Sequence, residues 1–188
     1  MEFLTGVKEK ETIGIREILS GDYVGKTVKM NGAVHNIRDM GEFAFIILRK
    51  AEGLVQCVYE EGKTEFDLKD LKEESAVEVT GVIALEERAP QGFELRLTGI
   101  RVLSEPAETM PIAINKWKMN TSLETRLSLR PVSLRNVRER AKFKIQEGIV
   151  RGFREFLSSQ GFTEVHTPKI VSRGAEGGAN VFKLNYFN

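Results

Sequence analysis

Few side chains in this sequence are of types that perform chemistry on their own. Cys57 is the only cysteine, and His35 and His166 are the only histidines. A single cysteine cannot form an intrachain disulfide or a thiolate cluster, and a zinc site normally needs three or four Cys, His or carboxylate ligands. We therefore expect neither a disulfide framework nor a metal site built by this chain alone.

The stretch RGAEGGAN places Glu176 directly before Gly177 and Gly178. A carboxylate suits a cationic partner, and two glycines let a loop hinge. The spacing matches neither a dinucleotide-binding fingerprint nor a P-loop. Taken alone, these residues predict only a mobile turn.

The composition limits the class of protein to which this chain can belong. The chain has 188 residues, of which 41% are hydrophobic and 29% charged, as in a soluble globular protein with one domain or one domain plus part of another. No apolar run has the length of a membrane span, and MEFLTGVKEKETIG lacks the pattern of a signal peptide. We expect a cytoplasmic protein without a membrane partner.

Charge is divided unevenly along the chain. Residues 1–105 hold 14 Lys and Arg against 20 Asp and Glu, a net charge of −6, whereas residues 106–188 hold 14 against 7, a net charge of +7. This difference indicates two modules. If the first module binds RNA, it must depend on specific base contacts, because it has no strongly positive field.

Alternating hydrophobicity predicts five β-strands in the first module. They are TVKMNGAVHNI, EFAFIIL, LVQCVY, AVEVTGVIAL and FELRLTGIRVL. A short helix is expected within TEFDLKDLKEE, between the third and fourth strands, and another, ending at Gly21, before the first. This order is typical of an OB-fold, a small Greek-key barrel that often binds oligonucleotides. Another small β-barrel or sandwich is the alternative.

A linker and a long helix follow the strands. The segment SEPAETMPIAINKWKMNTSLETRLSLRPV has three of the five prolines and little periodicity, which predicts a linker or hinge. Trp117 in this segment is expected to be a packing anchor between the modules, and stacking on a nucleotide, which no second feature supports, is the alternative. Apolar residues then recur at helical spacing over residues 136–160, with Gly161 as the C-terminal cap. Gly148 and Gly152 on this helix predict close approach by another backbone, and Pro168 ends the strand expected after it.

The long helix and the strand EVHTPKI together resemble motif 1 of class II aminoacyl-tRNA synthetases. The stretch ETRLSLRPVSLR is similar to the hinge of the subgroup that charges aspartate, asparagine and lysine, although Pro131 departs from it. Within this subgroup, VHTPKI and AEGGANVFKLNYF resemble the archaeal-type aspartyl branch. The resemblance implies an α+β chain: an OB-fold anticodon-binding domain over residues 1–104, a hinge over 105–135, and the start of an antiparallel class II catalytic domain over 136–188.

The resemblance also assigns roles to residues of the barrel. Phe45 matches the aromatic residue on which an anticodon base stacks, Gln56 matches the side chain that hydrogen-bonds the central anticodon uridine, and Glu94 matches a carboxylate that reads another anticodon base. Stacking tolerates any base, so discrimination needs donors and acceptors such as these at base edges. On pattern alone, Phe45 could be a core residue and the other two could be ordinary surface residues.

Two further positions bear on which tRNA is charged. His35 and Pro90 match loop positions that carry His and Pro in archaeal-type enzymes charging both the aspartate and the asparagine tRNA. This match implies a non-discriminating enzyme. Ala33, where the family often has Trp, departs from the pattern, and the alternative is a partly exposed strand histidine beside a turn-forming proline.

In the second module, the resemblance makes Glu176 the partner of the ammonium group of aspartate, and Gly148, Gly152 and Pro168 part of a homodimer interface. The complete family reaction uses ATP and Mg²⁺ to activate aspartate before transfer to tRNA, and relies on motifs 2 and 3. Because neither motif occurs before Asn188, we assign no catalytic residue, expect no cofactor bound by this chain alone, and expect the chain to be truncated. The alternatives are a stand-alone OB-fold RNA-binding protein and a dimeric interaction protein without catalytic activity.

Overall fold

A computed structural model describes residues 11–166 of the chain. Its helices and strands are, in order, α1 (Ile15–Ser20), β1 (Thr27–Asp39), β2 (Phe43–Arg49), β3 (Leu54–Glu60), the 3₁₀ turn η1 (Leu68–Asp70), β4 (Ala76–Leu85), β5 (Phe93–Ser104), α2 (Leu123–Ser128), α3 (Arg130–Ser133) and α4 (Val137–Ser159). The five predicted strands are confirmed. The helix predicted between β3 and β4 is reduced to η1.

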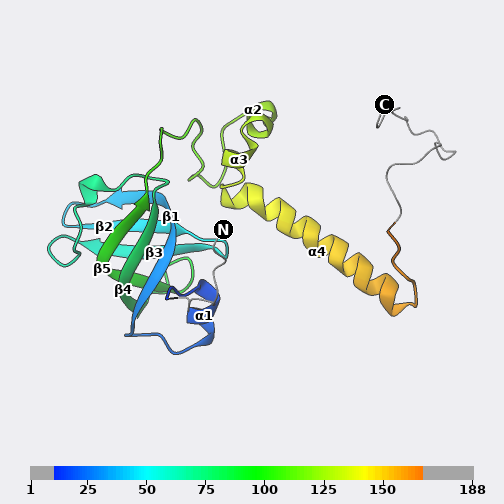
Figure 1. The fold of residues 1–188 in the computed structure, drawn as a ribbon, viewed down its shortest axis with the longest axis horizontal. Helices are drawn as coiled ribbons and strands as arrows, with labels where there is room; N and C mark the ends of the chain where they lie inside the picture. The colour runs from blue at the N-terminus through cyan, green and yellow to red at the C-terminus, as the bar shows by residue number, and fades with distance from the viewer. Residues whose placement is uncertain (1–10, 167–188) are drawn as a thin grey trace, which may run out of the picture. The chain divides into compact units, whose positions relative to one another are not determined.

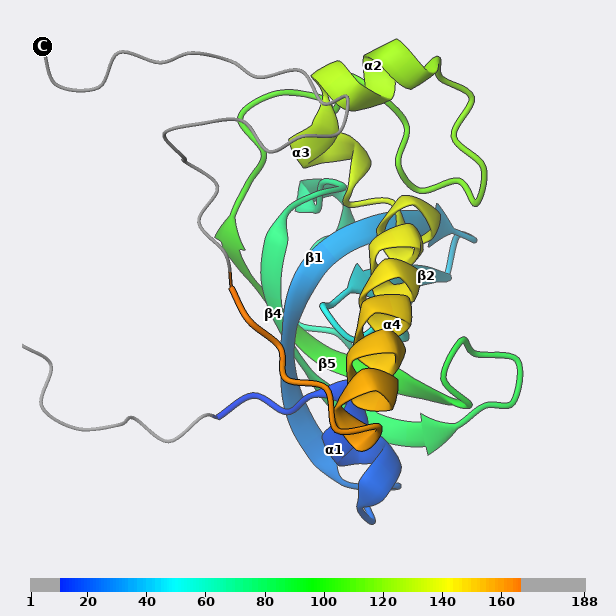
Figure 2. The same cartoon turned by 90° about the vertical axis from the view of Figure 1, so that its right-hand side faces the viewer.

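The strands close into a barrel in the order β1-β2-β3-β5-β4 (Figure 1). All neighbouring pairs are antiparallel except β3 and β5, which are parallel. Five strands in this order form the small barrel expected of an OB-fold. The predicted OB-fold is therefore confirmed. Figure 2 shows β1 curving along the barrel, and it is the strand that changes partner, pairing first with β4 and then with β2.

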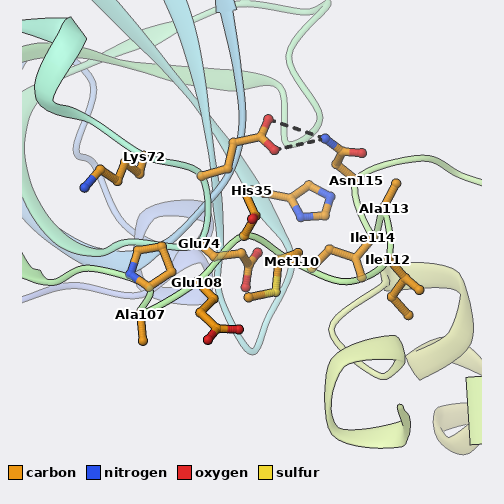
Figure 3. A pocket seen from close by; sticks show the side chains of 13 residues that line it. His35, Lys72, Glu74, Ala107, Glu108, Met110, Ile112, Ala113, Ile114 and Asn115 are labelled. Carbon is orange, nitrogen blue, oxygen red and sulfur yellow. Dashed lines mark hydrogen bonds between the residues drawn. The ribbon is translucent and has the colours of Figure 1, made fainter. Parts of the chain in front are cut away.

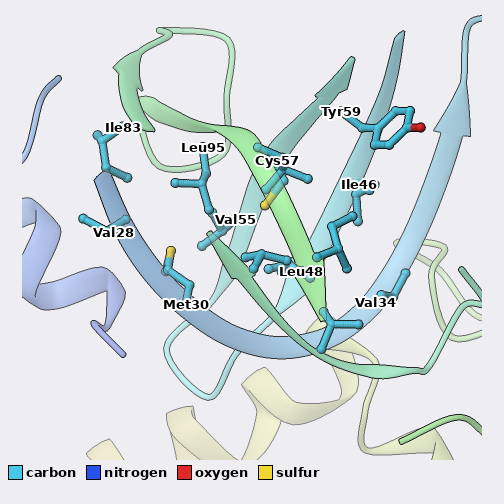
Figure 4. Packing of buried hydrophobic residues seen from close by; sticks show 14 of the residues in the cluster. Val28, Met30, Val34, Ile46, Leu48, Val55, Cys57, Tyr59, Ile83 and Leu95 are labelled. Atoms are coloured by element: carbon cyan, nitrogen blue, oxygen red, sulfur yellow. The ribbon is translucent and has the colours of Figure 1, made fainter. Parts of the chain in front are cut away.

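Alternation along the strands fills the barrel with apolar side chains (Figure 4). Met30, Val34, Ile46, Leu48 and Leu95 are all completely buried there. The helix predicted before the first strand is α1, and it packs against the barrel by adding Ile15 and Ile18 to the same core.

The strand pairing is broken at three places. One lies at His35, where the β1–β2 register shifts between Val34 and Asn36. The other two lie in the β4–β5 pairing, between Ala76 and Val77 and between Thr80 and Gly81. A Cβ atom on Gly81 would lie 2.3 Å from the carbonyl oxygen of Arg96. Only glycine lets the two backbones approach so closely here.

The segment predicted to be a featureless hinge is more ordered than expected. It contains α2 and α3, and its own small apolar cluster is formed by Ile112, Ile114 and Met119 with Leu129 and Val132 packed against them. Among the described residues, those up to Arg140 form one compact unit and those from Ala141 onward belong to another, so the hinge segment belongs to the same unit as the barrel. The three-part functional division of the chain stays a prediction.

Helix α4 confirms the predicted long helix almost to the residue. Its end is a Schellman motif: Phe162 N–H donates to the carbonyl of Leu157 at 3.1 Å, and Gly161 N–H donates to that of Ser158 at 3.1 Å. Gly161 has a φ of +83°, which suits glycine and confirms it as the cap. Residues 162–166 have no regular secondary structure, and the rest of the predicted strand, with Pro168, lies outside the described residues. None of the described helices has the length and apolar content that crossing a membrane requires.

Candidate nucleic-acid interface

The outer face of β2, β3 and β5 brings the predicted anticodon residues onto adjacent strands. In the strand register, Phe45 on β2 is opposite Val58 on β3, and Gln56 on β3 is paired with Glu94 on β5. Because the intervening residues point into the core, these side chains are directed outward. The parallel β3–β5 pairing, which no local sequence pattern reveals, is what places Gln56 beside Glu94.

Gln56, Glu94 and Arg96 form a short polar row. The amide Nε2 of Gln56 donates to Oε2 of Glu94 at 3.2 Å, and Nε of Arg96 donates to Oε1 at 3.3 Å. The Glu94 side chain is only 9% exposed, whereas that of Arg96 is 63% exposed. The carboxylate is therefore held in one orientation by two donors, and the Gln56 amide is fixed beside it. Fixed amide and carboxylate groups can discriminate base edges.

Phe45 lies on the outer side of the barrel and outside its core cluster. Its neighbours Ala44 and Ile46 are completely buried, but Phe45 is only partly buried. Its ring meets that of Phe43 edge to face, with centroids 5.5 Å apart and an interplanar angle of 85°. An aromatic ring braced at its edge and partly open to solvent can act as a stacking platform.

The end of this face is acidic. A hollow of about 540 Å³ is lined by Phe43 and Val58 together with Glu42, Glu60 and Glu61. Such a surface repels phosphate groups, so an RNA strand on this face would have to be held through its bases.

The structure corrects the predicted position of His35. It lies in β1 at the bulge and not in a loop, and it is 6% exposed. Its Nδ1 lies 3.1 Å from Nη1 of Arg49. Because a guanidinium can only donate, Nδ1 must accept, and the imidazole is neutral. Burial first, and then the charge of Arg49, lower the pKa of His35. Pro90, by contrast, is exposed in the β4–β5 connection.

A buried ion-pair cluster around Glu74 was not foreseen. Arg49 donates from Nη1 and Nη2 to the two carboxylate oxygens of Glu74 at 2.5 and 2.8 Å, and Arg135 donates to Oε2 at 2.8 Å. The Glu74 side chain is 4% exposed and that of Arg49 is 9% exposed. Burial would raise the pKa of Glu74, but the hydrogen bonds and charges of Arg49 and Arg135 outweigh it and lower that pKa.

The backbone of Glu74 adopts the left-handed region, with a φ of +68°, which a non-glycine residue adopts at some cost. Its N–H donates to the carbonyl of Val34 at 2.7 Å. Figure 3 shows Glu74 and His35 beside a cavity of about 520 Å³ that is also lined by Met110, Ile112 and Asn115. The cluster thus joins the barrel to the segment after β5.

The apolar surface of α4 is open in the described chain. Ile145, Ile149, Phe153 and Phe156 are each more than 60% exposed. An added Cβ at Gly148 or Gly152 would have no described atom within 4 Å. The close approach predicted at these glycines is therefore not made by the described residues of this chain. Glu176, like Pro168, lies outside the described residues.

Comparison with known proteins accounts for both parts of the chain. Residues 28–103 match the family described as OB-fold nucleic acid binding domain, and residues 122–187 match the family described as tRNA synthetases class II (D, K and N). This chain belongs to the class II tRNA synthetase family. The chain has relatives named aspartate–tRNA(Asp/Asn) ligase, at 44% identity in Deinococcus radiodurans and 42% in Archaeoglobus fulgidus. Both alignments cover 87% of this chain, but only 36% and 39% of the relatives.

Solved structures of the same family have a fold similar to that of this chain. Asparaginyl-tRNA synthetase of Pyrococcus horikoshii is 31% identical, with a TM-score of 0.75 over 88% of this chain and 38% of that one. Aspartyl-tRNA synthetase of Entamoeba histolytica is 27% identical, with a TM-score of 0.67 over 86% of this chain and 40% of that one. The chain thus spans well under half the length of the relatives it matches, and its fold is shared by enzymes named for two amino acids.

Proposed function

We propose that this chain is the tRNA-binding and dimerisation portion of an aspartate–tRNA ligase. The observation that carries the proposal is the fixed pair of Gln56 and Glu94 on the outer face of the barrel, with the partly exposed ring of Phe45 on the same face. One aromatic platform and two oriented polar groups suit unstacked bases. The names and coverage of the relatives support the same proposal.

In this proposal, an anticodon base stacks on Phe45, and Gln56 and Glu94 read base edges. Glu94 already accepts two hydrogen bonds, so it is pre-oriented before RNA arrives. Pre-orientation reduces the entropy lost on binding. The acidic hollow beside Phe43 favours base contacts over backbone contacts on this face.

The proposed partners are the aspartate tRNA and, for a non-discriminating enzyme, the asparagine tRNA as well. Relatives named for both tRNAs support this wider specificity. Pro90 is exposed, so it can touch RNA directly. His35 is buried, so its contribution would pass through Arg49, which it contacts.

Aspartate, ATP and Mg²⁺ are proposed as ligands of the complete protein. No group of three or more His, Cys, Asp or Glu side chains arranged to hold a metal ion is found within residues 11–166. Glu176 is retained as the proposed partner of the aspartate ammonium group.

The open apolar face of α4 supports the proposed homodimer. Small residues at Gly148 and Gly152 leave space for a second backbone, and the large exposed side chains around them would be buried by it. Pro168 is proposed to belong to the same interface.

Binding of an aspartate tRNA transcript to the chain tests the anticodon assignment. Phe45→Ala and Gln56→Ala should each weaken binding several-fold and leave the thermal unfolding of the chain cooperative. Thr27→Ala, an exposed residue where β1 pairs with β4, serves as the control and should bind like the parent chain. Unchanged binding by both test variants would refute the assignment.

A further inference from the structure

Trp117, the only tryptophan, is an exposed aromatic side chain in the segment between β5 and α2. It is 73% exposed and belongs to neither apolar cluster. The guanidinium carbon of Arg138 lies 5.9 Å from the centre of its ring, within cation–π range. Tryptophan is enriched at interfaces because it combines a large apolar ring with a polar N–H, so an exposed Trp beside a guanidinium is a candidate contact residue.

The ring and the guanidinium are placed by one buried side chain, Asn136, which is 2% exposed. Its Nδ2 donates to the carbonyls of Ile114 and Lys116, both at 2.8 Å. Its Oδ1 accepts from the backbone N–H groups of Arg138 at 3.0 Å and Glu139 at 3.1 Å, and so caps α4. Asn136 therefore ties the backbone next to Trp117 to the helical turn that carries Arg138.

The side chains next to Trp117 in sequence are basic. Lys116 and Lys118 flank Trp117, and both are exposed, as is Arg138. No acidic residue occurs between Glu108 and Glu124 in the sequence. In the first turn of α4, Glu139 receives a hydrogen bond from Arg126 at 3.0 Å, which offsets its charge.

We propose that Lys116, Trp117, Lys118 and Arg138 form a second RNA-binding patch, which contacts the phosphates and an accessible base or ribose of the tRNA outside the anticodon. The inference rests on the proposed tRNA-binding function and extends it. The end of the barrel face is acidic, whereas the patch is basic. In this proposal the barrel selects bases, and the patch attracts the phosphate backbone of the tRNA.

Trp117 allows a direct test, because excitation of tryptophan reports this one residue. Adding aspartate tRNA to the chain should quench the Trp117 emission, with a midpoint equal to the dissociation constant from filter binding. Trp117→Ala should weaken binding about fivefold or more, as expected for loss of one stacking contact, and Trp117→Phe should recover part of it. Replacing Lys116 and Lys118 by Gln should reduce the slope of log K against log salt by about one unit per lysine.

The anticodon supplies the control that separates this inference from the proposed function. The Trp117 and lysine variants should lose the same factor on the aspartate transcript and on one with a scrambled anticodon, whereas Gln56→Ala should lose affinity only for the former. If the parent chain bound both transcripts equally while the Trp117 and lysine variants still lost affinity, only the assignment of the barrel face would be refuted. Unchanged emission, affinity and salt slope in the patch experiments would overturn the patch. So would a Trp117 already shielded from acrylamide without RNA, because another part of the protein would then cover it.

Discussion

Replacing Glu74 by Gln tests whether the buried cluster joins the barrel to the segment after it. Glutamine has the same side-chain length as glutamate and meets the same left-handed backbone at this position, but it carries no charge. The new amide group would have to face Arg49 or Arg135 with donors of its own, because both partners donate. Arg49, which is 9% exposed, would be left as a buried charge without its carboxylate.

The magnitude follows from the burial of each partner. Loss of one member of a buried ion pair costs about 3–5 kcal/mol, whereas an exposed pair contributes about 1 kcal/mol or less. Arg135 is 42% exposed and can be rehydrated, so the lower end of the first range applies. We expect Glu74→Gln to lower the free energy of unfolding by about 3 kcal/mol, which for a chain of this size lowers Tm by about 6–12 °C.

Urea unfolding followed by circular dichroism measures this effect. Glu105→Gln is the matched control, because Glu105 pairs with Lys72 at the surface, where the side chains are 49% and 61% exposed. The control should change stability by about 0.5 kcal/mol or less. If Glu74→Gln were as mild as the control, the cluster would not be the stabilising link between the barrel and the following segment.

Three other expectations can be checked with the same chain. Folding lowers the pKa values of His35 and Glu74, so the unfolded chain binds more protons than the folded one. Stability should therefore decrease as the pH is lowered, below about pH 6.5 through His35 and below about pH 4.3 through Glu74. His35→Gln should flatten the first decrease in urea midpoints, and an unchanged decrease would contradict the role of His35. Gly81→Ala should destabilise the barrel by about 1–3 kcal/mol in thermal unfolding, because its Cβ would collide with the carbonyl of Arg96, and a neutral effect would contradict the close approach. Gly152→Ala should stabilise α4 by about 1 kcal/mol in the monomer but weaken self-association in sedimentation equilibrium, and unchanged association would remove this glycine from the proposed interface.

The strands could be predicted because their alternation reflects burial in the barrel, and α4 because its apolar residues recur at helical spacing, although they stay exposed in the described chain. Alternation located all five strands, and the spacing of apolar residues located α4 and its cap at Gly161. Helices α2 and α3 are six and four residues long, too short for a helical period. They depend on local contacts, such as the Ser122 hydroxyl that accepts from Thr125 N–H at 3.1 Å, and on the small cluster around Ile112.

The site was only partly accessible from sequence because it depends on register and on long-range contacts. Alternation shows that Gln56 and Glu94 are outward, but their pairing comes from the β3–β5 closure across 38 positions of sequence. The resemblance assigned His35 to a loop, but it lies within β1, where a bulge between Val34 and Asn36 lets both Val34 and His35 be buried. Glu74 was overlooked because its left-handed backbone and its arginine partners, 25 and 61 positions away, leave no local pattern.

The most direct measurement of the central claim compares two aspartate tRNA transcripts that differ only at the central anticodon uridine. The chain should bind the unaltered transcript roughly tenfold more tightly, the discrimination expected of one well-placed pair of hydrogen bonds. Gln56→Ala should bind both transcripts equally. Equal binding of the two transcripts by the parent chain, or full discrimination retained by Gln56→Ala, would contradict the assignment of this barrel face to anticodon recognition.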